Sequence, residues 1–135
     1  MTDERSSIRI HVLHCGSMLV SEVVPYGGGV NLKNARHGVF DKVADRVELP
    51  VSAYLIEHPK GKVLIDTGWS REISPDGVYD SSAVKRQLPG YLAAFYHPWV
   101  EKGKTAAEQL AAMGIAPEEL SSRIWTRITQ AACAR

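Results

Sequence analysis

The sequence predicts an α/β (α+β) fold, and three observations predict it. The apolar run at residues 63–65 is typical of a strand buried on both faces. Apolar residues at helical spacing follow it between residues 81 and 96. A helix-start pattern at Thr105 then continues the alternation of strand and helix along the chain. With 135 residues, the chain is one domain or part of a larger one.

Composition and charge restrict the class of protein. Apolar residues make up 44% of the chain and charged residues 23%, which is ordinary for a globular domain. The net charge is +1 and no basic stripe is present, so we expect no nucleic-acid partner. No apolar run approaches the ~20 residues of a membrane span, and the polar first residues do not resemble a signal peptide. Cys15 and Cys133 are far apart, which favours a reduced, cytoplasmic setting.

The first strand is expected at residues 8–13, where apolar and polar residues alternate. His11, His14 and Cys15 are residue types that bind metals, but positions 11 and 14 of a strand point to opposite faces. We therefore interpret them as structural. Irregular backbone is expected from Cys15 onward. The glycine-rich residues 25–29 lack the spacing of a phosphate-binding loop.

A β-hairpin is the clearest local pattern. Residues 49–58 predict one strand, residues 59–62 contain proline and glycine in favoured turn positions, and residues 63–66 predict the returning antiparallel strand. The polar stretch before it, residues 31–47, is expected to be a loop that closes over a ligand.

Asp66 ends the second hairpin strand, and Thr67 and Gly68 turn the chain beyond it. A carboxylate is thereby expected at the carboxyl end of a core strand, which is where layered α/β proteins build their sites. The alternative is an Asp that only accepts hydrogen bonds from the following turn. Trp69 comes next, and it either walls a pocket or covers the end of the sheet.

Two helical segments are expected in the second half of the chain. Residues 81–96 form an amphipathic pattern interrupted at Pro89. Thr105 and Glu108 form a capping box that opens a second helix, which Gly114 ends. A short helical turn begins at Pro117, and a strand should follow it.

Two segments then resemble a known family. They are LPVSAYLIEHPKGKVLIDTGW at residues 49–69 and AAEQLAAMGIAPEEL at residues 106–120; HVLHCGSM at residues 11–18 is similar as well. Together they resemble the N-terminal half of the metallo-β-lactamase superfamily, and within it the N-acyl-homoserine lactonase group. The resemblance implies about half of an αββα sandwich over residues 1–120.

The resemblance also implies a chemistry. In that family the strand after residue 120 leads into a His-x-His-x-Asp-His motif that holds two metal ions, usually zinc. Metal lowers the pKa of a bound water to about 7, and the resulting hydroxide opens a lactone or another acyl carbonyl. Of the family pattern only Asp66 carries over, as a residue that supports the site together with Thr67 and Gly68. No catalytic residue and no metal ligand is present in this reading frame, so no cofactor is expected for this chain.

The codons that can encode residues 121–135 offer a reason why the metal-binding motif is missing. Trp is encoded by TGG, so reading from the last base of each codon turns Trp125 followed by Thr126 into GAC, which is Asp. The neighbouring codons permit Ser-His-Leu-Asp-Ala-Asp-His-Ala-Ser-Gly-Leu, which is similar to the missing motif. We therefore predict a frame slip near Leu120, with residues 121–135 as an out-of-frame tail. The alternative is an authentic amphipathic tail.

Three hypotheses follow for the function. The first is a truncated and inactive part of a metal-dependent hydrolase that acts on lactones or on related β-lactams, thioesters or esters. The second is a small non-catalytic α/β module that binds a ligand through residues 27–47 and Trp69. The third is the product of a pseudogene.

Overall fold

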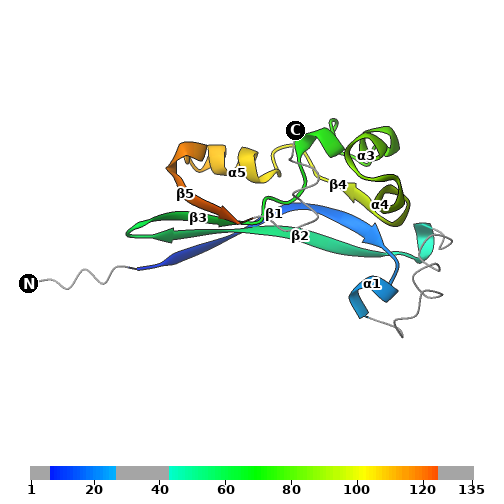
Figure 1. Ribbon diagram of the computed structural model, residues 1–135, viewed down its shortest axis with the longest axis horizontal. Coiled ribbons are helices and arrows are strands. Elements are labelled where there is room, and N and C mark those ends of the chain that lie inside the picture. The colour runs from blue at the N-terminus through cyan, green and yellow to red at the C-terminus, as the bar shows by residue number, and fades with distance from the viewer. Residues whose placement is uncertain (1–6, 27–42, 125–135) are drawn as a thin grey trace, which may run out of the picture.

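Five strands form one curled sheet in the order β4-β1-β2-β3-β5 (Figure 1). The computed structural model describes residues 7–26 and 43–124. Neighbouring strands are antiparallel except β3 and β5, which run parallel. The strand bounds are Arg9–Val20 for β1, Val47–His58 for β2, Gly61–Ile65 for β3, His97–Trp99 for β4 and Leu120–Ile124 for β5.

The β2–β3 hairpin is confirmed, with Tyr54 opposite Ile65 and His58 opposite Gly61. The first strand was predicted too short, because β1 does not become irregular at Cys15. A bulge between His14 and Ser17 instead lets β1 continue. Gly16 makes this bulge with a φ of 102°, and its backbone lies so close to β4 that a Cβ would be 2.3 Å from the Trp99 carbonyl oxygen. The longer strand therefore pairs with β4 as well as β2.

Short helices lie in the connections. The predicted break at Pro89 is confirmed, since it separates α3 from α4. Asp80 caps α3 by accepting from the Ser82 and Ala83 amides. None of the described helices is long and apolar enough to cross a membrane. The bounds are Val23–Tyr26 for α1, Ser81–Gln87 for α3, Gly90–Phe95 for α4 and Ala106–Ala112 for α5, with 3-10 turns at Val43–Asp45, Arg71–Ile73 and Pro117–Glu119.

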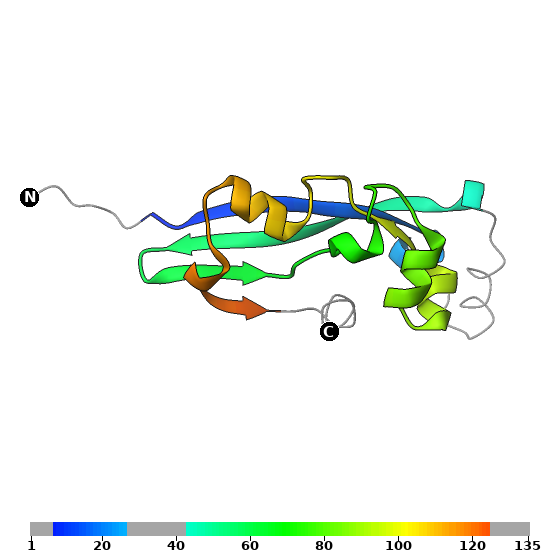
Figure 2. The same ribbon diagram turned by 90° about the horizontal axis from the view of Figure 1, so that it is seen from above.

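Helix α5 covers one face of the sheet, as Figure 2 shows from above. Its N-terminal capping box is formed as predicted: Thr105 Oγ1 accepts from the Glu108 amide, and Glu108 Oε2 accepts from the Thr105 amide. Burial of apolar side chains between helix and sheet provides the main stabilisation of this layer. The buried cluster contains Leu13, Cys15, Ala53, Leu55, Leu64, Ala106, Leu110 and Ile115.

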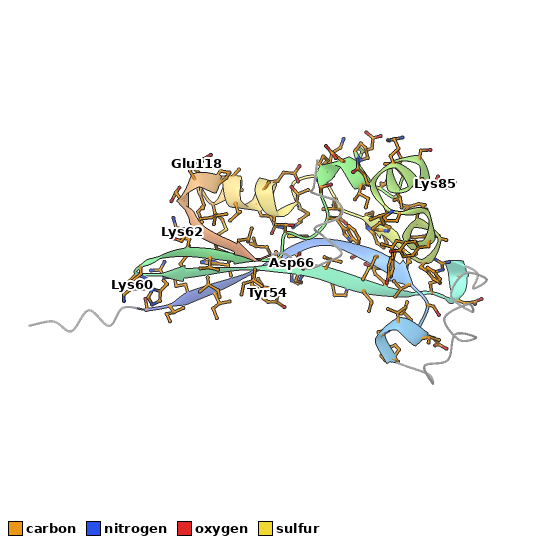
Figure 3. All side chains as sticks on the ribbon, in the orientation of Figure 1. Tyr54, Lys60, Lys62, Asp66, Lys85 and Glu118 are labelled. Carbon is orange, nitrogen blue, oxygen red and sulfur yellow. The ribbon has the colours of Figure 1, made fainter. Side chains whose placement is uncertain are left out.

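The opposite face of the sheet is apolar, and the described residues cover it only in part. The register places six apolar side chains side by side on it, and α3, α4 and α5 all lie on the other side (Figures 1 and 3). Ile10 is 64% exposed and Val12 is 52% exposed. Adjacent apolar side chains on one face of a sheet are normally covered by other parts of a protein or by a partner. We call this surface the bare face; it consists of Ile10, Val12, Tyr54, Ile56, Val63 and Ile65.

Polar substitution on the bare face should make the chain more soluble. Replacing both Ile10 and Val12 with threonine keeps β-branched side chains in the strand and removes apolar surface from water. We expect more protein in the soluble fraction and weaker fluorescence of a hydrophobic dye. Leu13→Thr is the matched control, because Leu13 is buried under α5 and its replacement should lower solubility. Equal behaviour of the two variants would contradict the assignment of faces.

Candidate functional site

Asp66 stands at the carboxyl end of β3, as predicted, and begins a tight turn (Figure 3). Its φ is 64°, in the left-handed region that Asp tolerates better than most residues. The carboxylate oxygen Oδ1 accepts hydrogen bonds from the Thr67 amide at 2.6 Å and the Gly68 amide at 3.2 Å. These bonds hold the turn and fix the carboxylate at the lip of the sheet.

Gly68 brings the turn against β1. Its φ is 61°, and a Cβ at this position would lie 2.1 Å from Cys15 Cβ. The Trp69 amide donates to the Cys15 carbonyl oxygen at 3.3 Å. Burial raises the pKa of the Cys15 thiol to about 11, so this side chain acts as a neutral packing group. The loop after β3 is thus fixed to β1 by a contact that only glycine permits.

Alanine at position 68 should destabilise the chain clearly more than alanine at position 114. Both glycines have positive φ, but a Cβ at Gly114 would meet no atom within 4 Å. Gly114→Ala therefore reports the backbone strain alone, about 1 kcal/mol. Gly68→Ala adds the clash with Cys15, and we expect a loss of about 2–4 kcal/mol in the free energy of unfolding. Urea denaturation measures both, and equal losses would mean that the loop moves away from β1 without cost.

Trp69 is buried in a second apolar cluster between the loop and the helices. It packs with Ile73, Val84, Leu88 and Val100, and it is among the largest fully buried side chains. Its side chain also borders a groove beside α5. Trp69 therefore covers the end of the sheet and walls a groove at the same time, so both predicted placements agree with the geometry. A role in ligand binding stays a prediction.

Three polar atoms of this loop have no hydrogen-bond partner among the described residues. They are Thr67 Oγ1, Trp69 Nε1 and Ser70 Oγ, each with almost no surface accessible to solvent. A buried donor without an acceptor costs about 1–3 kcal/mol. The loop after β3 therefore carries hydrogen-bonding capacity that the described part of the chain does not use.

Arg71 ties the loop to α5 and to the segment before it. Its guanidinium donates to both carboxylate oxygens of Glu108, through Nε at 3.2 Å and Nη2 at 2.7 Å. It also donates to the carbonyl oxygens of Ser74 at 2.9 Å, Val100 at 2.8 Å and Glu101 at 2.7 Å. The sequence analysis missed this residue. The available signal was Glu108 in the capping box. Its pairing with Arg71, 37 residues earlier in the chain, could not be read from the sequence.

Stability should depend on pH through Glu108. The Arg71 guanidinium, together with the Thr105 cap, lowers the pKa of the Glu108 carboxyl from 4.5 to about 2. A lowered pKa in the folded state contributes stability above pH 4.5, which is lost as the pH falls toward 2. We expect the melting temperature to fall over this interval, and to fall less steeply in Glu108→Gln. Parallel pH profiles for the two proteins would contradict this assignment.

The histidines that the structure describes do not form a common site. His11 and His14 lie on opposite faces of β1, as predicted: His11 Nε2 is 3.3 Å from Glu57 Oε1, whereas His14 Nδ1 is 3.3 Å from Ser52 Oγ. His97 stacks on the ring of Tyr79 at 4.8 Å. Residues 31–42 of the predicted closing loop, including His37, lie outside the described residues.

Metal-binding residue types are scattered within the described ranges. In residues 7–26 and 43–124, no three His, Cys, Asp or Glu side chains lie close enough together to hold an ion. The chemistry of the described residues therefore does not fit a di-metal site. Asp66 is the one carboxylate at the lip of the sheet that the sequence analysis named, and its oxygen Oδ1 is occupied by the turn.

Comparison with known proteins finds a similar sequence in an N-acyl homoserine lactonase. The chain is 34% identical over 73 residues to the N-acyl homoserine lactonase AttM of Rhizobium johnstonii, which covers 54% of this chain and 25% of that protein. No family model matches the chain. The chain thus spans about a quarter of the length of the curated relative that it matches.

Solved structures give the same likeness at the level of fold. One is an N-acyl homoserine lactone hydrolase with the product N-hexanoyl-L-homoserine bound at its catalytic metal center. Its TM-score is 0.60 at 16% identity, over 84% of this chain and 38% of that one. A quorum-quenching N-acyl homoserine lactone hydrolase has a TM-score of 0.55 at 16% identity, over 84% of this chain and 35% of that one. The predicted α/β fold is thereby confirmed, as a match to part of these longer chains.

Proposed function

The described residues have part of the metallo-β-lactamase fold in its lactonase-like form. From this premise we propose that the chain is the N-terminal part of a metal-dependent hydrolase. Its substrate class in this proposal is a lactone, with N-acyl-homoserine lactones first and related esters second. The chain contributes the first sheet and the loop Asp66, Thr67 and Gly68 that supports the site. By itself it is inactive and holds no catalytic metal.

The position of β5 is the observation that carries this proposal. Strand β5 runs parallel to β3, and Ile124 pairs with Ile65. The chain therefore leaves β5 directly beside Asp66, at the lip where α/β proteins build sites. The metal-binding sequence that the shifted frame permits would begin at this place. The direction of β5 and the codons that the amino-acid sequence permits both support a metal-binding motif beside the supporting loop.

The test begins with the coding DNA. Sequencing from the codon of Glu119 onward should find that the shifted frame stays open and encodes His-x-Asp-x-Asp-His. A gene restored to that frame should give a protein that contains zinc and hydrolyses N-hexanoyl-homoserine lactone. We expect turnover at least about a thousandfold above that of the 135-residue chain, since catalysed reactions usually exceed their background by far more. Asp66→Asn in the restored protein tests the supporting role of the loop.

Other outcomes would favour other functions. Zinc-dependent turnover by the 135-residue chain would contradict the proposal, and so would a shifted frame that soon meets stop codons. A stable, monodisperse and metal-free fold of the 135 residues would favour the small binding module. An open frame that encodes a zinc protein without lactonase activity would leave the fold and the metal in place and change the substrate to another ester or thioester.

A further inference from the structure

The six residues of the bare face form two rows across β1, β2 and β3. Tyr54 stands at the centre of one row, opposite Val12 in β1 and Ile65 in β3. Its side chain lies on the side of the sheet away from the helices (Figure 3) and is 42% exposed. All six side chains are uncharged, so they offer no ion pair to a charged partner. The bare face therefore favours an apolar partner.

The polar side chains at both ends of the two rows are already bonded within the chain. At one end His14 Nδ1 lies 3.3 Å from Ser52 Oγ. At the other end the Lys60 amide donates to His58 Nδ1 at 3.1 Å. A surface that covers these ends therefore meets polar groups that have a partner, which lowers the cost of burying them. The partner needs to bring neither a charge nor a hydrogen bond.

A second copy of the chain has a surface that meets these conditions. Its bare face is also apolar, and two such faces place no charge opposite a like charge. Sheets pack face to face at a distance of about 10 Å, with the side chains of the two faces interdigitated. Two identical surfaces can make this contact around a twofold axis, which is the commonest symmetry of protein dimers.

Helix α1 limits how two copies can be arranged. It follows the end of β1 at Val20 and lies on the same side of the sheet as the bare face (Figure 1). Two copies with parallel strands would bring their α1 helices to the same end, where the helices would collide. Copies with antiparallel strands have the two helices at opposite ends. Tyr54 then lies near the twofold axis, because it stands in the middle strand of the contact.

The available area suits a weak dimer. A buried aliphatic side chain removes on the order of 60–100 Å² of apolar surface from water. The partly exposed bare face and its bonded polar ends thus offer roughly 500 Å² in each copy, or about 1,000 Å² in a dimer, which is the lower limit for a specific interface. We therefore expect reversible association with a dissociation constant of roughly 10–100 µM.

We infer that the 135-residue chain forms a twofold dimer in solution, in which the bare faces of two copies pack against each other with antiparallel strands and Tyr54 lies close to the axis. The inference goes beyond the proposed function and does not depend on it, since the contact involves no metal and no substrate. Reversible association leaves monomer and dimer together in solution, which differs from the monodisperse fold that would favour a binding module.

The test is a charge exchange at position 54. Sedimentation velocity of the purified chain, from about 1 to 200 µM, measures the dissociation constant. Tyr54→Lys and Tyr54→Glu should each weaken self-association at least about tenfold, because like charges would meet near the axis in apolar surroundings. An equimolar mixture of the two variants should associate at least about tenfold more tightly than either variant alone, since unlike charges then meet.

Val78→Lys is the matched control. Val78 is 63% exposed, but it lies outside the three strands of the bare face, so its replacement should leave the dissociation constant unchanged. Circular dichroism checks that each variant is folded. If the variants at position 54 do not fold, the same exchange is made at Val12, which is 52% exposed in the neighbouring strand.

Each result decides the inference. A chain that is monomeric at every concentration would overturn it and would leave the bare face to another segment of the chain or to a different partner. Dimers that persist in Tyr54→Lys, or that Val78→Lys weakens equally, would also overturn it. Recovery of association only in the mixture supports the twofold contact, because non-specific aggregation does not require opposite charges at one position.

Discussion

Replacing Trp69 with alanine should remove most of the free energy of unfolding of the chain. Trp69 is 2% exposed and belongs to the buried cluster with Ile73, Val84 and Leu88. Truncating a buried aromatic side chain of this kind costs about 3–5 kcal/mol, which is a large part of the 5–15 kcal/mol that holds an ordinary domain together. Urea denaturation followed by circular dichroism, in the more soluble Ile10→Thr/Val12→Thr background, measures the loss.

Two controls interpret that result. Tyr91→Ala removes an aromatic side chain of α4 that is 66% exposed, and it should change the free energy of unfolding by no more than about 0.5 kcal/mol. Trp69→Phe keeps an aromatic ring and removes the indole N–H, which has no acceptor in the described part of the chain. It should cost less than the alanine variant. A Trp69→Ala protein as stable as Tyr91→Ala would mean that the loop after β3 is not part of the folded core.

Replacing Arg71 with alanine should also lower the free energy of unfolding, by about 2–3 kcal/mol. The guanidinium makes five hydrogen bonds, two to Glu108 and three to backbone carbonyl oxygens. Its loss leaves the Val100 and Ser74 carbonyls without this donor and releases the loop from the N-terminus of α5. Because both side chains of the ion pair are about one-third exposed, solvent screens the charge term, and most of the loss comes from the carbonyl contacts.

The matched controls separate geometry from charge. Arg71→Lys keeps the positive charge but cannot place several donors in one plane, so it should recover only a small part of the stability. Lys85→Ala removes an exposed cation from α3 and should be nearly neutral. If Arg71→Lys were as stable as the parent, a simple charge near Glu108 would suffice and the carbonyl contacts would contribute nothing. Thermal melts of the three variants at pH 7 distinguish these cases.

The local elements of the fold followed from neighbouring residues. The β2–β3 hairpin, the turn at Asp66, the break at Pro89 and the capping box at Thr105 are all formed as predicted. Each depends on contacts within a few residues, and such contacts are encoded in short patterns of apolar, turn-forming and capping residues. The bulge at Gly16 was missed because its cause, the approach of the Trp99 carbonyl, lies far along the chain.

The segment after Leu120 likewise depends on a contact with residues far along the chain. The sequence analysis expected a strand after the turn at Pro117, but it also interpreted residues 121–135 as an out-of-frame tail. The structure places β5 at Leu120–Ile124 beside β3. Pairing with a parallel neighbour requires backbone groups and no alternating side chains, so a pattern of side chains could not predict it. Whether residues 121–135 are an out-of-frame tail stays a prediction.

By itself the sequence determined the class of fold, the hairpin with Asp66 at its end, and the resemblance to a lactonase without its metal motif. These depend on residue type and spacing over short stretches. Only the tertiary structure decided that Arg71 joins the loop to α5, that Gly68 packs on Cys15, and that buried polar atoms without a partner among the described residues lie in the loop after β3. Those features join residues dozens of positions apart, and their partners become known only when the sheet order brings them together.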